Sequence, residues 1–198
     1  MGGTKCRGNE NWRWQKKPYI ADDNDSAEKR FEKAVALRCP DWVNMVPVAS
    51  GVLPDADEGG RRIDLAHQCG QGWFEFVELK AGVNCDWPLH AAIEILGYGL
   101  IYLFSRCNQN ALGYPENNAL LTARRIDLKV LAPFESYRPG SLAGFEREIR
   151  KGLQALEIEG LKMDFCFEQF PPGAEVVDES APALINSRTA VYSSHHYR

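Results

Sequence analysis

The sequence predicts an α/β domain in which a mixed central β-sheet is flanked by helices. Composition is the first observation: the 198 residues are 44% hydrophobic and 25% charged, which is ordinary for one globular domain with a sizeable core. Second, segments with the two-residue alternation of strands are interleaved with segments of helical period. Third, their order is α-β-β-β-α-β-α-β, which is typical of a sheet covered by helices.

The first half of the chain is expected to hold one helix and three strands. Asp25, followed three residues later by Glu28, predicts the start of a helix, and Pro40 ends it. The strands are predicted over residues 41–53, 61–68 and 72–82, with an acidic turn over 54–60. The short connection between the second and third strands favours a hairpin.

The second half begins with a long helix over residues 84–107, with Asp86 as its N-cap and Pro88 in its first turn. The remaining elements are a strand over 119–133, a helix over 141–158 and a strand over 161–172. The chain therefore divides into an N-terminal arm over 1–25, a single domain over 26–172 and a C-terminal tail over 173–198. The tail is rich in serine, proline and alanine, and we expect part of it to be disordered.

Cysteine usage and charge narrow the class of protein. The six cysteines form no CxxC pair and no signal peptide precedes them, which predicts free thiols in the reducing cytoplasm. No apolar run reaches the ~18 residues that a membrane span needs, and the four histidines show no zinc-ligand spacing. The net charge of −4 counts against binding nucleic acid through overall charge alone.

The N-terminal arm interleaves aromatic and basic residues in "NWRWQKKPY" (11–19). Two interpretations are open at this stage. The aromatic rings could stack on nucleic-acid bases while the lysines bind phosphates. Alternatively, Trp12 and Trp14 pack onto the domain and the arm is structural.

Charged residues stand in the predicted hairpin where apolar residues would pack better. In "FEFVELKAG" (74–82), Glu78 and Lys80 share one face of the strand, because side chains alternate. In "GGRRIDLAH" (59–67), Asp64 faces away from Ile63 and Leu65 by the same rule. These three charges form either a catalytic site or an ordinary cross-strand ion pair between Asp64 and Lys80.

The register of the hairpin decides whether the two carboxylates meet. If Asp64 lies opposite Glu78, residues 70–72 form a three-residue loop in which Gly72 can supply a positive φ. A two-residue turn over 70–71 would instead send the carboxylates to opposite faces.

Two adjacent carboxylates cannot both stay ionised without a cation. Oxygen ligands of this kind suit Mg²⁺ or Mn²⁺, and the carbonyl of Leu79 is a further expected ligand beside Asp64 and Glu78. Such a cation activates water and polarises a phosphoryl oxygen, while Lys80 can position the water or stabilise developing charge.

Asp64 and the run Glu78-Leu79-Lys80 resemble the motif of the PD-(D/E)XK nuclease superfamily, which has a restriction-endonuclease-like fold with an α-β-β-β-α-β core. The resemblance covers about residues 26–132. It implies a catalytic role for Glu32 on the first helix, and a substrate-binding role for Glu94 and Tyr98 at the place of the Gln-xxx-Tyr of many members. Glutamate replaces glutamine at position 94, and Ile63 replaces the proline of the motif.

The resemblance implies a Mg²⁺- or Mn²⁺-dependent nuclease that hydrolyses nucleic acid, with DNA favoured over RNA. Lys80 and nearby bases would bind the phosphates: Arg61, Arg62, Arg124 and Arg125. A non-catalytic binding module that retains this fold is the alternative function, and a domain with only a surface ion pair is the third. Glu32 could instead belong to a solvated helix face, and Tyr98 to the core. The sequence leaves the oligomeric state open.

Overall fold

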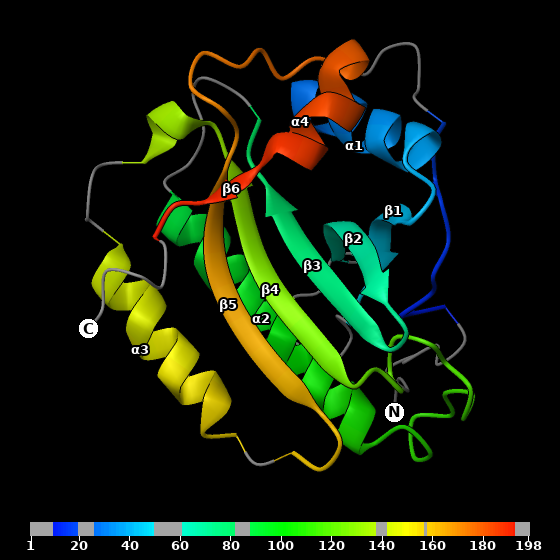
Figure 1. The fold of residues 1–198 in the computed structure, drawn as a ribbon. Helices are drawn as coiled ribbons and strands as arrows, with labels where there is room; N and C mark the ends of the chain where they lie inside the picture. The colour runs from blue at the N-terminus through cyan, green and yellow to red at the C-terminus, as the bar shows by residue number, and fades with distance from the viewer. Residues whose placement is uncertain are drawn as a thin grey trace, which may run out of the picture.

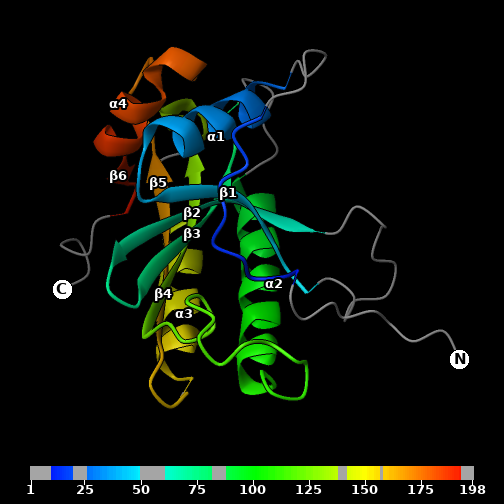
Figure 2. The same ribbon diagram turned by 90° about the vertical axis from the view of Figure 1, so that its right-hand side faces the viewer.

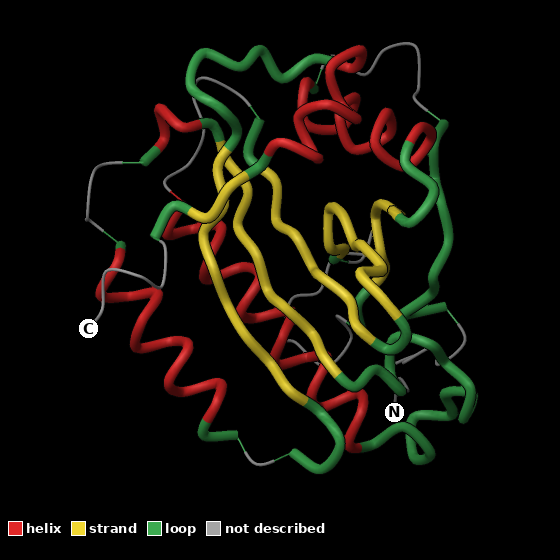
Figure 3. Tube along the Cα trace, viewed as in Figure 1, coloured by secondary structure: helices red, strands yellow, loops and turns green. Residues whose placement is uncertain are grey.

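The computed structural model describes residues 10–19, 26–49, 61–81, 88–137, 142–156 and 158–192. Within these ranges a six-stranded sheet in the order β1-β2-β3-β4-β5-β6 is flanked by helices. The pairings β1–β2–β3 are antiparallel, β3–β4–β5 are parallel, and β6 is antiparallel to β5. The predicted mixed α/β class is therefore confirmed, and Figure 3 shows the helices packed around the sheet.

The strands are β1 (Trp42–Pro47), β2 (Arg62–Gly70), β3 (Trp73–Leu79), β4 (Arg125–Ala132), β5 (Lys162–Gln169) and β6 (Thr189–Ala190). The α-helices are α1 (Ala27–Arg38), α2 (Pro88–Cys107), α3 (Ala143–Gln154) and α4 (Ala181–Ser187), and short 3-10 turns cover Phe134–Ser136 and Asp178–Ser180. The predicted order of elements holds through β5. The predicted acidic turn and Asp86 lie outside the described residues.

Helix α1 begins one residue later than the capping pattern predicts. Ser26, rather than Asp25, is the N-cap, because its hydroxyl accepts a hydrogen bond from the Lys29 amide at 3.4 Å. Asp25 itself lies outside the described residues. Helix α1 ends at Arg38, two residues before Pro40, as expected.

Helix α2 covers one face of β3 and β4 (Figure 1). Gly99 permits a close approach, because a Cβ there would lie 2.6 Å from a methyl carbon of Leu128 in β4. By length and composition this helix could cross a membrane, with a mean hydropathy of 1.3 over its most apolar window, but half of that window is buried inside the protein.

The N-terminal arm packs onto the domain, as the structural interpretation predicted. Trp12 is 1% exposed, and its ring lies 6.2 Å from that of Phe76 and 5.5 Å from that of Tyr102. Trp14 contacts Phe74 with ring centroids 5.2 Å apart. Trp12 therefore belongs to the core, the half-buried Trp14 packs against it, and the arm runs beside β1 (Figure 2).

Residues 173–192 are part of the domain rather than a tail. Helix α4 packs against α1, and β6 extends the sheet beside β5. Arg30 of α1 donates to the Asp178 carboxylate at 3.0 Å, and Arg38 donates to the Asp178 carbonyl at 2.6 Å. These long-range contacts order a segment whose composition alone indicated a tail.

Candidate active site

The β2–β3 hairpin brings Asp64 and Glu78 to facing positions. Leu65 pairs with Val77, so Asp64, one residue earlier, lies opposite Glu78 in the register that the site requires. Residues 70–72 do not form a plain three-residue loop, however. Strand β2 runs on to Gly70, the register shifts there, and a two-residue turn follows in which Gly72 has the predicted positive φ of 69°.

The faces of β3 follow the prediction, and those of β2 do so only in part. Phe76 lies in the core under α2, whereas Leu79 lies in the second core, near α1 and α4. Ile63 was expected on the same face as Leu65, but it joins the core under α2. The physical reason is a local break in alternation: Met45 of the neighbouring strand, whose position faces Asp64, has a φ of +53°.

Glu32 approaches this pair from α1, as its position on the helix predicted. The residue is fully buried, and its Oε1 accepts a hydrogen bond from Lys29 Nζ at 2.7 Å. The same ammonium lies 3.3 Å from Asp64 Oδ1. Lys29 therefore bridges the two carboxylates, and Glu32 does not belong to a solvated face.

Asp64 also binds the backbone of the motif strand. Its Oδ2 accepts a hydrogen bond from the amide of Leu79 at 3.0 Å. This bond ties Asp64 to the end of β3, so its carboxylate is held in place by β3 on one side and α1 on the other.

Lys80 reaches the same group of side chains. Its Nζ donates to Glu78 Oε1 at 2.8 Å and lies 4.0 Å from Glu94 Oε2 on α2. Tyr98, which is 4% exposed, donates its hydroxyl to Glu94 Oε1 at 2.7 Å. Although burial opposes it, the neighbouring carboxyl groups of Glu78, Asp64 and Glu28 together raise the pKa of Lys80, so Lys80 stays protonated. The structure thus brings Glu94 and Tyr98 to the site, and Tyr98 is both buried and hydrogen-bonded there.

Two residues of α1 belong to the site but were not predicted for it. Lys29 forms the bridge described above, and Glu28 Oε1 accepts a hydrogen bond from the Ala81 amide at 3.2 Å. The sequence signal was present, because Glu28 and Glu32 are four residues apart and so share one helix face.

The site holds more carboxyl groups than ammonium groups, and two of the carboxyls are deeply buried. The carboxyl groups come from Glu28, Glu32, Asp64, Glu78 and Glu94, and the ammonium groups from Lys29 and Lys80. Burial and the charge of Asp64 raise the pKa of Glu78 to about 9 and that of Glu32 to about 8. Both groups hold protons at neutral pH that a cation could replace.

Each of these buried glutamates has one oxygen without a hydrogen-bond partner. Glu32 Oε2 and Glu78 Oε2 are two of the four buried side-chain polar atoms that lack one among the described residues. Buried polar groups are nearly always satisfied, so such an atom needs an explanation. A divalent cation bound between them would satisfy both, and carboxylate oxygens are the ligands that Mg²⁺ and Mn²⁺ prefer.

The metal-free protein is expected to lose stability as the pH rises from about 5 to about 8. Above their ordinary pKa of 4.5, Glu32 and Glu78 are ionised in the unfolded chain but protonated in the folded one. The folded state then binds more protons, so each group lowers the free energy of unfolding by at most about 1.4 kcal/mol per pH unit. Urea unfolding across this range measures the slope, and Glu78→Gln should flatten it. Stability that rises with pH in the wild type would contradict the protonated state.

The predicted phosphate-binding arginines divide into two groups. Arg61 and Arg62 lie at the end of β2 that carries Asp64. Arg124 and Arg125 do not join the site: Arg125 faces Trp73, six residues from the level of Leu79, or roughly 20 Å along the strand. Arg125 instead donates to Asp127 at 2.8 Å.

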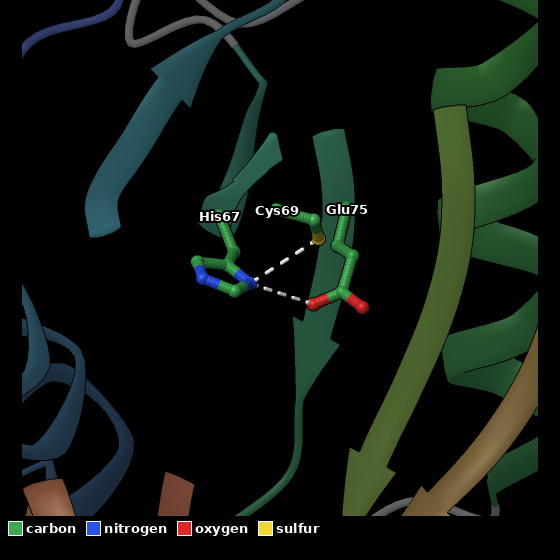
Figure 4. Close-up of side chains that lie close together, drawn as sticks. All are labelled: His67, Cys69 and Glu75. Atoms are coloured by element: carbon green, nitrogen blue, oxygen red, sulfur yellow. Dashed lines mark hydrogen bonds and ion pairs between the residues drawn. The ribbon is translucent and has the colours of Figure 1, made fainter. Parts of the chain in front are cut away.

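A different trio brings three potential ligand atoms within 4.8 Å of one another in the described part of the chain: His67, Cys69 and Glu75 (Figure 4). Glu32, Asp64 and Glu78 do not close to that distance as a set, with Lys29 and Lys80 bound to them instead. The trio of Figure 4 is a poor metal site. Both Glu75 oxygens already face cationic side chains, and burial raises the pKa of the Cys69 thiol to about 12.

Comparison of the chain with models of protein families, with curated proteins and with solved structures finds no match. That Asp64, Glu78, Lys80 and Glu32 form one group therefore follows from their own contacts.

Proposed function

We propose that this protein is a Mg²⁺- or Mn²⁺-dependent phosphodiesterase that hydrolyses nucleic acid, with DNA as the favoured substrate. The observation that carries the proposal is the pair of buried, unpartnered oxygens on Glu32 and Glu78, beside Asp64. Ionisable groups that are buried without hydrogen-bond partners destabilise the folded protein unless a bound ligand compensates for the missing partners. A divalent cation is the ligand that matches an excess of carboxylates.

The arrangement of elements supports membership of the PD-(D/E)XK superfamily. Helix α1, the strands β1 to β3, helix α2 and strand β4 follow the order of a restriction-endonuclease-like core. Asp64 lies in the second of these strands, and Glu78-Leu79-Lys80 lies where the third one ends. Glu32 stands on the preceding helix, as the resemblance implies.

The residues of the chain have separable roles in this proposal. Asp64, Glu78 and Glu32 would hold the cation, and a bound Mg²⁺ or Mn²⁺ supplies Lewis acidity and makes water a better nucleophile at neutral pH. Lys80, protonated and held by Glu78, stabilises the negative charge that develops on the phosphoryl oxygens. Tyr98 and Glu94 position Lys80 from the α2 side.

We expect the wild-type protein to cleave DNA in the presence of Mn²⁺ or Mg²⁺ and to lose this activity when a chelator is added. Lys80→Ala should reduce cleavage by about 100-fold or more, the scale of losing one preorganised charge donor. Single- and double-stranded oligonucleotides, with RNA in parallel, measure both effects. Cleavage that survives in Lys80→Ala would point to a contaminating nuclease or another site.

A non-catalytic binding module is the second candidate, and the position of Lys29 favours it. Its ammonium already contacts both Glu32 and Asp64, which is one way to fill an acidic pocket without a metal. The two candidates differ in the same assay. A module would bind nucleic acid or another partner with no metal-dependent cleavage of any substrate.

A further inference from the structure

Three segments bring basic side chains together beside the candidate active site. The arm is fixed at Lys17, whose amide donates to Asn44 Oδ1 at 2.8 Å and whose carbonyl accepts from Asn44 Nδ2 at 3.0 Å. Arg62 opens β2 opposite Pro47, two residues before Asp64. Lys33 stands one turn after Lys29 on α1, which packs on β1.

Within the described part of the chain, none of these three cations has an anionic partner of its own. Among the residues that the structure describes, Lys17, Lys33 and Arg62 form no ion pair within 4.0 Å, and each is partly exposed. Burial, and then the charges of Arg62, Arg13 and Lys33, lower the pKa of Lys17, so these cations lie near enough to repel one another.

We propose that Lys17, Lys33 and Arg62 form a basic surface that binds the phosphates of the nucleic-acid strand entering the candidate active site. This inference rests on the proposed function for its ligand. A cluster of like charges is costly without counter-ions, and a row of phosphates supplies them. The protein as a whole carries a net charge of −4, so the basic surface is a local feature.

The arm contributes charge here rather than base stacking. Trp12 is buried against Phe76, and the half-buried Trp14 packs against Phe74, so both rings are engaged by the domain. Arg13, which alternates with them, is exposed. Binding through this surface should therefore depend steeply on salt and little on base sequence.

The test is equilibrium binding of a fluorescent single-stranded DNA in EDTA, where cleavage cannot occur, over a series of salt concentrations. The triple variant Lys17→Gln, Lys33→Gln, Arg62→Gln should flatten the slope of log K against log salt by about 2, or roughly 100-fold in affinity at 0.1 M salt. The matched control is Arg147→Gln, Lys151→Gln, Lys162→Gln, which removes the same charge from α3 and β5. It should bind like the wild type.

The outcomes separate this inference from the proposed function. An equal loss of DNA affinity in both triple variants, or no loss in either, would overturn the proposed basic surface, whatever the result of the cleavage assay. Loss in the first variant alone, with circular dichroism unchanged, supports the surface. If that loss is found while the wild type cleaves nothing with Mn²⁺, the surface stands and the nuclease proposal fails.

Discussion

Asp64→Asn and Glu78→Gln are each expected to abolish Mn²⁺-dependent cleavage of DNA. Each change replaces a charged oxygen ligand by a neutral amide of almost the same size, so the fold should survive. Glu78 is 3% exposed and already protonated near neutral pH, which makes glutamine a close mimic of its metal-free state. In Asp64→Asn the side chain keeps an oxygen that can accept the hydrogen bond from the Leu79 amide. Plasmid and oligonucleotide cleavage, with circular dichroism as the folding check, measure the effect.

Glu148→Gln is the matched control for these substitutions. Glu148 lies on α3, with its carboxylate 3.1 Å from Lys151 Nζ and its side chain 61% exposed. The same change of carboxylate to amide there should leave cleavage within about twofold of wild type, because it touches neither the site nor the core. Full activity in Asp64→Asn would contradict the assignment of the site.

The second large effect concerns a charged network buried on the sheet face opposite α2. Lys129 of β4 forms ion pairs with Glu75 of β3 and Glu168 of β5, both at 2.5 Å, and Arg188 pairs with the same two carboxylates at 2.7 Å. Although burial opposes it, the hydrogen bond from His67 and the charges of Lys129 and Arg188 lower the pKa of Glu75 to about 2. Both glutamates of this network contact the same two cations.

Lys129→Met is expected to lower the free energy of unfolding by about 3–5 kcal/mol, because it leaves the buried carboxylates of Glu75 and Glu168 to share one cation, Arg188, so that a buried negative charge is uncompensated. Lys129 is 8% exposed, and the methionine side chain fits a similar volume, so lost charge rather than lost packing is tested. Urea unfolding at pH 7 measures the change. The control Lys151→Met, at an exposed pair on α3, should stay within about 0.5 kcal/mol of wild type. A similar small effect for Lys129→Met would show that the network contributes little.

The elements that could be predicted are those with a strong local pattern. Two-residue alternation predicted β3 and its faces, and the distance from Asp64 to Glu78 limited the hairpin to few registers. The face of Ile63 was wrong because Met45, on the partner strand, breaks the regular geometry. Such a break depends on two strands together and leaves no mark in either sequence alone.

The C-terminal segment was missed for a related reason. Residues 173–192 have little periodicity, and their structure depends on partners far away in the sequence, such as Arg188 with Glu75. The alternation of the strands does not indicate that Glu75, Lys129 and Glu168 are buried. Arg188, in this same segment, pairs with Glu75 and Glu168, a long-range contact that local propensity does not report.

Calorimetric titration of Mn²⁺ into the metal-free protein at pH 7.5 tests the central claim most directly, namely that Asp64, Glu78 and Glu32 hold a divalent cation. The wild type should bind one Mn²⁺ saturably and release protons, because the pKa values of Glu32 and Glu78 are raised to about 8 and about 9. Asp64→Asn should weaken the binding, whereas Lys80→Ala should retain it. Unchanged Mn²⁺ affinity in Asp64→Asn, or no saturable binding by the wild type, would contradict the assignment of these residues as a metal site.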